Sequence, residues 1–267
     1  MKFLKNLFKK PPQYPLGLIG PDKTDRRDFI KVPLGGSPRP IDLIEEYFTS
    51  FQVRNQGQTN RCTGFAGAYG LEILNKKLAQ AANANWDIKF SANDAYWYAR
   101  KDKTKDEGAF LRDLMKGLAT HGACHEMYWS DSKSPFKRPS DFDNIARFKI
   151  RTNYERVIGF GQRGLEDCIN VLSIEKLPIF IGMTMQENAT NYANRNGIYP
   201  IPNSRDAIMG GHAMVFVGWK EIHNKVYFKT LNSWGDKIGS NGYYWLPADL
   251  LESGIVFDLW TVGREYY

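Results

Sequence analysis

Residues 56–67, QGQTNRCTGFAG, decide the fold, because here a polar, glycine-containing loop runs directly into a helix of small residues, with Cys62 at the junction. From Thr63 to about Ala82 apolar residues recur with helical spacing, which predicts a buried helix beginning at or beside Cys62. The positive end of a helix stabilises a thiolate at its first residue. Its free amides also point toward an oxyanion beside the sulfur, and the side-chain amide of Gln56 can supply a second donor. The segment therefore predicts a reactive cysteine.

A histidine and an asparagine that can serve this cysteine lie at the ends of two apolar segments. His212 opens the segment Ala213–Trp219, and Asn232 follows the segment Val226–Leu231. We expect these segments to pair as a hairpin that turns at His223-Asn224, which brings the two far ends together. The asparagine can then orient the imidazole, and the imidazole can act as the base for the thiol.

Three segments carry a resemblance to a known family. They are VRNQGQTNRCTGF at 53–65, GGHAMVFVGW at 210–219 and LNSWGDKIGSNGYYWL at 231–246. In this order they resemble the active-site blocks of papain-like (C1 family) cysteine peptidases, and Pro40-Ile41-Asp42-Leu43 resembles the mature N-terminus of that family. The resemblance covers about residues 40–267. It implies an α+β, two-lobed fold, with a helical left lobe, an antiparallel β-barrel-like right lobe and the active-site cleft between them.

The resemblance also implies roles for individual residues. Cys62 would be the nucleophile, His212 its base and Asn232 the orienting group, while Gln56 and the Cys62 amide would form the oxyanion hole. Trp234 would cover the His–Asn contact and shape the leaving-group side. The remaining residues expected to bind substrate are Glu107, Gly108, Phe110, Gly182, Met183, Gly211 and Ala213.

The chain departs from the family pattern around the nucleophile. Thr63 follows the cysteine where an aromatic residue is usual. Thr59 stands where the family usually has a disulfide cysteine, and its partner near Glu107-Gly108 is also missing. The chain therefore resembles a bacterial- or phage-type variant without the usual active-site-loop disulfide.

We expect hydrolysis of peptide bonds through a thioester acyl-enzyme, with a peptide or protein as substrate. Two alternatives stay open: acyl or amide transfer on the same triad by a transpeptidase, deamidase or amidase, and a non-catalytic papain-fold binding protein. No cofactor is expected. His121, Cys124 and His125 lack a fourth ligand and the spacing of a metal site, so no metal is expected either.

Charge divides the chain into a basic N-terminal extension, residues 1–39, and a peptidase domain, residues 40–267. The extension contains nine Lys or Arg and three Asp, so it holds six of the seven net positive charges, and no nucleic-acid-binding face is expected on the body. A short stretch alternates Phe3, Leu4, Leu7 and Phe8 with lysines. The extension can mask the enzyme, or contact a membrane surface or a protein partner; the alternative is an arm packed on the body, or a frayed tail.

Within the domain, about residues 40–145 are predicted to be mainly helical, with helices after Ser91 and over Ala109–Thr120. Residues from about 146 to 267 are predicted to be mainly β.

Cysteine use and hydropathy bear on localisation. Three cysteines do not make a disulfide framework, although a single bridge between Cys124 and Cys168 stays open. No apolar run reaches the roughly 18–20 residues of a membrane span, and no signal peptide is recognisable. A cytoplasmic or other reducing compartment fits best, and the sequence does not indicate an oligomeric state.

Overall fold

The computed structural model describes residues 15–23, 25, 26, 28–140, 142–150, 153–158 and 161–263. The amphipathic stretch predicted within residues 1–10 lies outside them. The helices are α1 (Leu43–Tyr47), α2 (Cys62–Ala81), α3 (Ala92–Ala99), α4 (Leu111–Thr120), α5 (Gly161–Ser173), α6 (Glu187–Asn196), α7 (Asp249–Glu252) and a 3-10 turn at Phe142–Asn144. The strands are β1 (Ile41–Asp42), β2 (Ala123–Cys124), β3 (Arg147–Phe148), β4 (Tyr154–Arg156), β5 (Ile179–Gln186), β6 (Ile208–Ile222), β7 (Lys225–Leu231), β8 (Tyr243–Pro247) and β9 (Val256–Val262).

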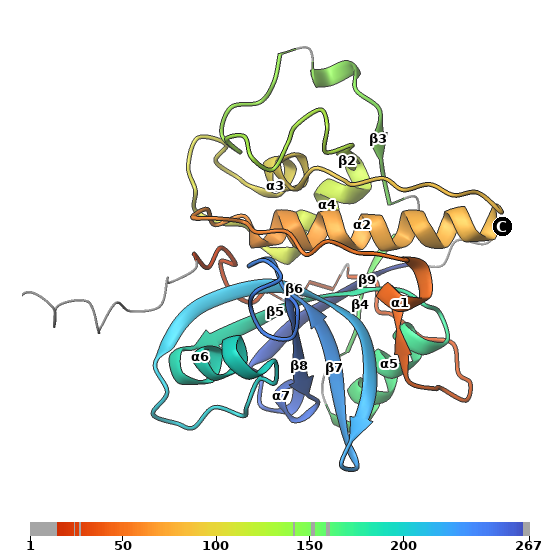
Figure 1. Ribbon diagram of the computed structural model, residues 1–267, viewed down its shortest axis with the longest axis vertical. Coiled ribbons are helices and arrows are strands. Elements are labelled where there is room, and N and C mark those ends of the chain that lie inside the picture. The colour runs from red at the N-terminus through yellow and green to blue at the C-terminus, as the bar shows by residue number, and fades with distance from the viewer. Residues whose placement is uncertain are drawn as a thin grey trace, which may run out of the picture.

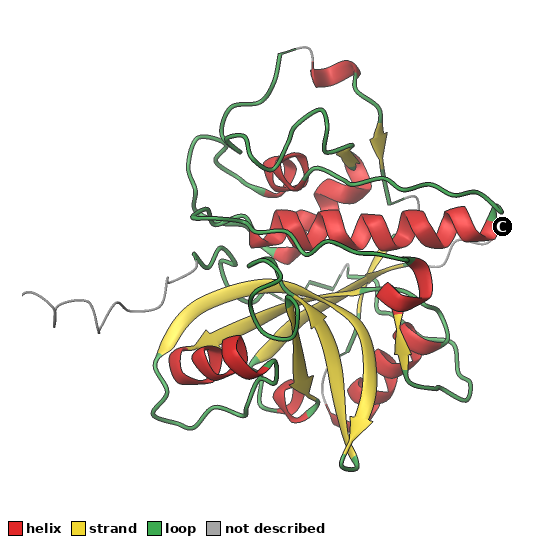
Figure 2. Cartoon of the chain, viewed as in Figure 1, coloured by secondary structure: helices red, strands yellow, loops and turns green. Residues whose placement is uncertain are grey.

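The described strands form a seven-stranded antiparallel sheet and a separate small ribbon. The large sheet has the order β4-β9-β5-β6-β7-β8, with β1 paired to β6, and β2 pairs with β3. Helices α2, α3 and α4 form a layer above this sheet, whereas α5, α6 and α7 surround its other parts (Figures 1 and 2). This arrangement gives the helical and β halves that the sequence predicted.

Three glycines let helix α2 lie unusually close to its neighbours. A side chain on Gly64 would meet the carbonyl of Ala92 on α3, and one on Gly67 would meet Leu114 on α4. A Cβ on Gly70 would lie 2.1 Å from the ring of Phe180 on β5. Because these glycines are spaced three apart, they lie along one side of the helix. They therefore allow α2 to be packed tightly against helices and sheet together.

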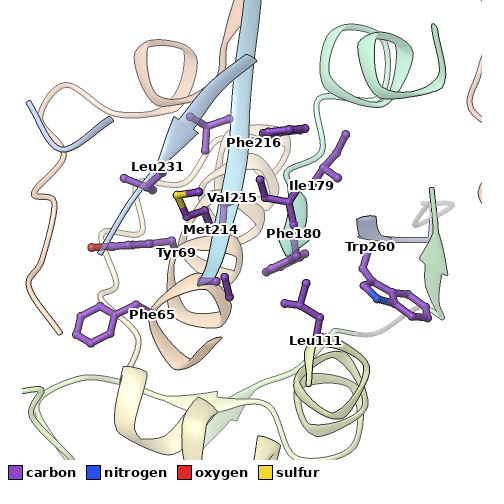
Figure 3. Close-up of a cluster of buried hydrophobic side chains, with 14 of the residues drawn as sticks. Phe65, Tyr69, Leu111, Ile179, Phe180, Met214, Val215, Phe216, Leu231 and Trp260 are labelled. Carbon is purple, nitrogen blue, oxygen red and sulfur yellow. The ribbon is translucent and has the colours of Figure 1, made fainter. Parts of the chain in front are cut away.

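The core lies between α2 and the central strands. Phe65 and Tyr69 of α2 are buried with Phe180 of β5 and with Val215 and Phe216 of β6. Figure 3 shows these side chains in the buried cluster that α2 and the two strands form. Large apolar side chains buried at this interface contribute about 1.5–3 kcal/mol each relative to exposure, so the interface that positions the start of α2 also stabilises the fold.

Several predicted elements are confirmed, and four helices have no counterpart in the sequence prediction: the short α1 and α7 and the longer α5 and α6. The helix at Cys62, the helix after Ser91 and the hairpin turning at His223-Asn224 are all present. The helix predicted over Ala109–Thr120 begins two residues later. Helices α5 and α6 were not predicted, because the second half was interpreted as strands and turns; the spacing of Leu165, Cys168, Ile169 and Leu172 in α5 carries the missed helical signal.

The bridge left open between Cys124 and Cys168 does not form, since all three cysteines are free. In the described part of the chain, no helix has the length and apolar character needed to span a membrane.

We expect Gly70→Val to lower stability, because the new side chain must overlap the Phe180 ring. Overpacking of this kind costs about 1–3 kcal/mol, which corresponds to a fall of about 2 to 10 °C in Tm for a chain of this size. Thermal melting checks this. Gly35→Val is the matched control, because no atom lies within 4 Å of its Cβ position. Equal Tm values for the two variants would contradict the packing argument.

Candidate active site

Cys62 is the first residue of α2, and the loop before it is held in place by buried charged groups. Arg61 donates to the carbonyl of Gln56 and to that of Asp131. Asn60 binds Asp106 twice, through its backbone N–H at 2.8 Å and its side-chain amide at 2.6 Å. These bonds join the nucleophile loop to the segment before Gly108. The family resemblance implies a disulfide between the same two segments, which this chain lacks.

The predicted histidine and asparagine lie side by side. His212 is on β6, Asn232 directly follows β7, and the two side chains meet at 2.8 Å between Nε2 and Oδ1. The same Oδ1 accepts the backbone N–H of Ser233 at 2.7 Å, so the amide orientation is fixed by a group that can only donate. Nε2 of His212 must then carry the proton, which leaves Nδ1 as the basic nitrogen.

Burial shapes the chemistry of this pair. His212 and Asn232 are almost completely buried, and Trp234 lies over the imidazole with 4.6 Å between ring centroids. His212 Nδ1 has no hydrogen-bond partner among the described residues. A buried polar atom without a partner is costly, and in a native structure it calls for an explanation. A nitrogen held free for proton transfer is such an explanation.

Gln56 is fixed beside the cysteine loop. Its Oε1 accepts from Ser233 at 2.6 Å, and its Nε2 donates to the carbonyls of Thr59 and Pro15 at 2.7 and 3.0 Å. The donor that the sequence predicted for an oxyanion is therefore bound to a carbonyl of the N-terminal extension.

Residues 15–22, here called the leader segment, lie along the site by main-chain hydrogen bonds. Leu18 N–H donates to the carbonyl of Gly211, and Ala109 N–H donates to that of Gly17 at 2.9 Å. Ile19 N–H completes the pairing with the Ala109 carbonyl. The segment thus runs antiparallel to β6 and parallel to the chain at Ala109. Figure 1 shows the dark red start of the described chain between the helical layer and the sheet.

Two leader residues fit closely against the site. A Cβ on Gly17 would lie 1.6 Å from the carbonyl oxygen of Asn60, so only glycine can occupy this position. Leu18 is buried, and its side chain lies over Gly182 together with the ring of Phe257. The leader segment therefore occupies the surface on which the sequence predicted substrate binding.

The covered site is electrically neutral. Burial raises the pKa of the Cys62 thiol to about 11, against the opposing effect of nearby backbone groups that include Gly17. Burial also lowers the pKa of His212 to about 4, although the bond to Asn232 acts the other way. With the leader segment in place, the thiol is protonated and the imidazole uncharged at neutral pH.

The predicted substrate-binding residues other than Trp234 divide into three groups. Gly108, Gly182 and Gly211 all approach the leader segment closely. Glu107 is exposed and pairs with Lys105, whereas Phe110 lies under the ammonium of Lys101. Met183 and Ala213 are fully buried neighbours of His212.

Sequence reasoning missed two contact residues. Ala109 supplies the backbone bonds, and Phe257 forms the wall opposite Leu18. Ala109 directly follows the predicted Glu107-Gly108, so a shift of one residue would have found it.

A polar pocket adjoins the site on the side of Trp234. Its volume is about 680 Å³. Charged side chains line it, including Arg54, Lys89, Asp131 and Asp236. Among the described residues, no cluster of three or more His, Cys, Asp or Glu could hold a metal ion.

A known family matches most of this chain. The model described as papain family cysteine protease matches residues 37–256, and the chain therefore belongs to that family. Xylellain, a cysteine protease from Xylella fastidiosa, has a structure that superposes with a TM-score of 0.78 at 27% identity, over 97% of this chain and 100% of that one. The predicted family, the papain-like (C1 family) cysteine peptidases, and the predicted fold are thus confirmed.

Two curated relatives align over shorter stretches. An uncharacterised peptidase C1-like protein of Acanthamoeba polyphaga mimivirus is 28% identical over 165 residues, 59% of this chain and 52% of that protein. Cathepsin B-like cysteine proteinase 3 of Ostertagia ostertagi is 33% identical over 124 residues, 45% of this chain and 68% of that protein. This chain thus spans about half the length of the viral relative that it matches.

We expect Gly17→Leu to expose Cys62, because the leucine side chain has no room beside Asn60. An overpacking cost of about 1–3 kcal/mol shifts the equilibrium between covered and open site by about 5- to 150-fold. The rate at which iodoacetamide labels Cys62, mapped by mass spectrometry, should rise accordingly. Gly35→Leu is the control, and labelling unchanged from that variant would contradict the steric argument.

The second prediction for this site concerns Asp22, the last residue of the leader segment. Burial and the neighbouring carboxylate of Asp258 raise its pKa to about 6, against the opposing effects of Arg112 and Arg156. A pKa raised on docking means that Asp22 holds its proton more tightly in the docked leader segment. Its contribution to the stability of docking is therefore full below about pH 4 and is lost as the pH rises through 6. We expect His212 to act oppositely, because burial lowers its pKa to about 4 in the covered form.

The Asp22→Asn variant separates the two effects. The masking factor, defined as the labelling rate of Cys62 with Gly17→Leu divided by the rate with Gly17, cancels the intrinsic titration of the thiol. In Asp22→Asn chains we expect the masking factor to grow between pH 4 and 6.5, because His212 loses its proton over this range. With Asp22 present we expect the loss of the Asp22 proton to offset this growth. Identical curves for chains with and without the Asp22→Asn substitution would rule out a role for this carboxyl.

Proposed function

We propose that this chain hydrolyses peptide bonds with Cys62 as nucleophile, His212 as base and Asn232 as the orienting group. The observation that carries the proposal is the hydrogen bond from His212 Nε2 to the side-chain oxygen of Asn232. This atom must be the amide oxygen, because it also accepts the backbone N–H of Ser233. The hydrogen bond leaves the basic Nδ1 of a buried imidazole without another partner among the described residues. Membership of the papain family supports the same chemistry.

The reaction begins once the leader segment has left. Water then reaches the pair, the burial that keeps both groups neutral is relieved, and the proton of the Cys62 thiol passes to His212 Nδ1. The thiolate attacks the substrate carbonyl carbon, and the Cys62 amide with Gln56 Nε2 binds the resulting oxyanion. This use of Gln56 requires the Pro15 carbonyl, now bound to it, to move away.

His212 next returns its proton to the leaving amine, and the C–N bond breaks to leave a thioester on Cys62. The imidazole then removes a proton from water, the hydroxide attacks the thioester, and the thiol is restored as the carboxylate product leaves. Trp234 keeps competing water from the His–Asn bond throughout. An amine in place of water would give acyl transfer, and added amine would then appear in the product.

The leader segment supports a second part of the proposal, which is that the extension inhibits the enzyme. It occupies Gln56, Gly211 and the space over Gly182, all groups that a substrate would need. A peptide substrate cannot use these groups at the same time. The chain as folded therefore represents a covered form, and substrate turnover requires the segment to move.

In the Gly17→Leu background we expect Cys62→Ala to abolish peptide hydrolysis. Asn232→Ala should lower kcat by about 100-fold, because a misplaced imidazole costs about that much. Peptide-library cleavage checks both, with an added amine in parallel to detect transfer products. Cys168→Ala is the control, since this buried cysteine lies in α5, away from the site residues. Full activity of Cys62→Ala would refute the assignment of Cys62 as nucleophile. An unreactive Cys62 thiol in the Gly17→Leu chain would indicate a non-catalytic protein.

A further inference from the structure

The N-terminal extension makes a second set of contacts after the leader segment. Residues 28–34, here called the anchor segment, run beside strand β4 at the end of the sheet. Lys31 N–H donates to the carbonyl of Arg156 at 2.8 Å, and Arg156 N–H donates to that of Phe29 at 2.7 Å. Ile30 thus pairs with Arg156 in parallel, so the anchor segment extends the sheet beyond β4.

The side chain of Lys31 is buried, and each of its N–H groups finds an acceptor. Its Nζ lies 2.8 Å from Glu175, 3.1 Å from Glu155 and 3.3 Å from the carbonyl oxygen of Val262. Only 1% of the Lys31 side chain and 2% of the Glu175 side chain are exposed. Glu175 also accepts the backbone N–H of Leu34 at 3.0 Å. A lysine can make three such bonds, and this site supplies all three.

Asp28 connects the anchor segment to both halves of the domain. Its carboxylate accepts from Arg112 on α4 at 2.8 Å and from Arg156 on β4 at 3.2 Å. It is itself almost fully buried. Loss of the segment would therefore leave two arginines without this counter-charge, in addition to a buried glutamate without its lysine. Breaking a buried ion pair by removing one partner is strongly destabilising.

The leader segment is attached by different means. Main-chain bonds and glycine contacts hold most of it. At its end the Asp22 N–H donates to the Asp258 carboxylate, and the Asp22 carboxylate accepts the backbone N–H of Arg112 at 2.9 Å, although the two carboxylates carry like charge. The exposed Lys23 and Arg26 lie between the two segments. The anchor segment, in contrast, points Phe29 and Val32 into solvent and depends on Lys31.

We propose that the catalytic domain carries a docking surface for residues 28–34, separate from the active site, and that this segment stays bound when residues 15–22 leave. The surface consists of the β4 edge, the acidic pair Glu155 and Glu175 and the carbonyl of Val262, and it accepts a strand with one inward lysine. The inference rests on the proposed inhibition by the leader segment. The anchor segment is then part of the open enzyme. The portion of the extension that leaves the active site ends before Asp28.

Hydrogen exchange on the full chain tests this directly. In Gly17→Leu, peptides that report the amides of residues 16–22 should lose protection, while those that report Lys31 and Leu34 should keep it. Loss of protection in both segments together would overturn the inference. The measurement needs no turnover, so it stands even where the chain proves inactive. If Gly17→Leu keeps normal protection at residues 28–34 but does not hydrolyse peptides, the proposed function is refuted and the inference about the anchor segment stands.

Trypsin treatment of the native full chain gives a second route to the open form. Cleavage after Lys23 or Arg26 should release the leader segment and raise the Cys62 labelling rate, and the remaining chain should resist cleavage after Lys31. Cleavage after Lys31 at a comparable rate would overturn the inference. Lys31→Met should lower Tm by about 10 °C, whereas the control Lys23→Met, at an exposed position, should leave it within about 2 °C. Equal Tm values would also overturn it.

Discussion

The packing of α2 against strands β5 and β6 is the contact on which the site depends. It places Cys62 at the start of the helix above the strand that carries His212, and it requires the close approach that Gly70 allows to Phe180. Neither of the two proposed catalytic groups can be positioned within its own element alone, because one comes from a helix and the other from a sheet. The rigidity of the buried interface is therefore what makes a reactive pair from two distant segments.

The covered state shows how burial alone can switch off such a pair. A thiolate and an imidazolium both need solvation or each other, and burial of both groups disfavours their charged forms. The neutral forms then dominate, with the thiol pKa near 11 and the imidazole pKa near 4. The proposed inhibition would therefore be chemical as well as steric, because a protonated thiol is a weak nucleophile even toward a small reagent.

Local signals predicted the family, the helix at Cys62 and the hairpin that joins the two apolar strands. Such features depend on residues near one another in sequence, and the register of the hairpin follows from its two-residue turn as far as the irregularity between Phe216 and Gly218. The wall formed by Phe257 could not be predicted in this way, because β9 meets β5 only through the assembled sheet. The same holds for Ala109, whose contact is made by its backbone and leaves no mark on its residue type.

The anchor segment shows most clearly where reasoning from hydropathy fails. In FIKVPL, residues 29–34, the pattern predicts apolar residues inside and lysine outside, yet Lys31 is buried while Phe29 and Val32 are exposed. Two glutamates and a carbonyl, brought together from β4, the end of α5 and β9, reverse the usual preference. A buried lysine is stable only where such partners are already fixed. The acidic site therefore belongs to the folded domain, and the strand that fills it is recognised by charge rather than by apolar surface.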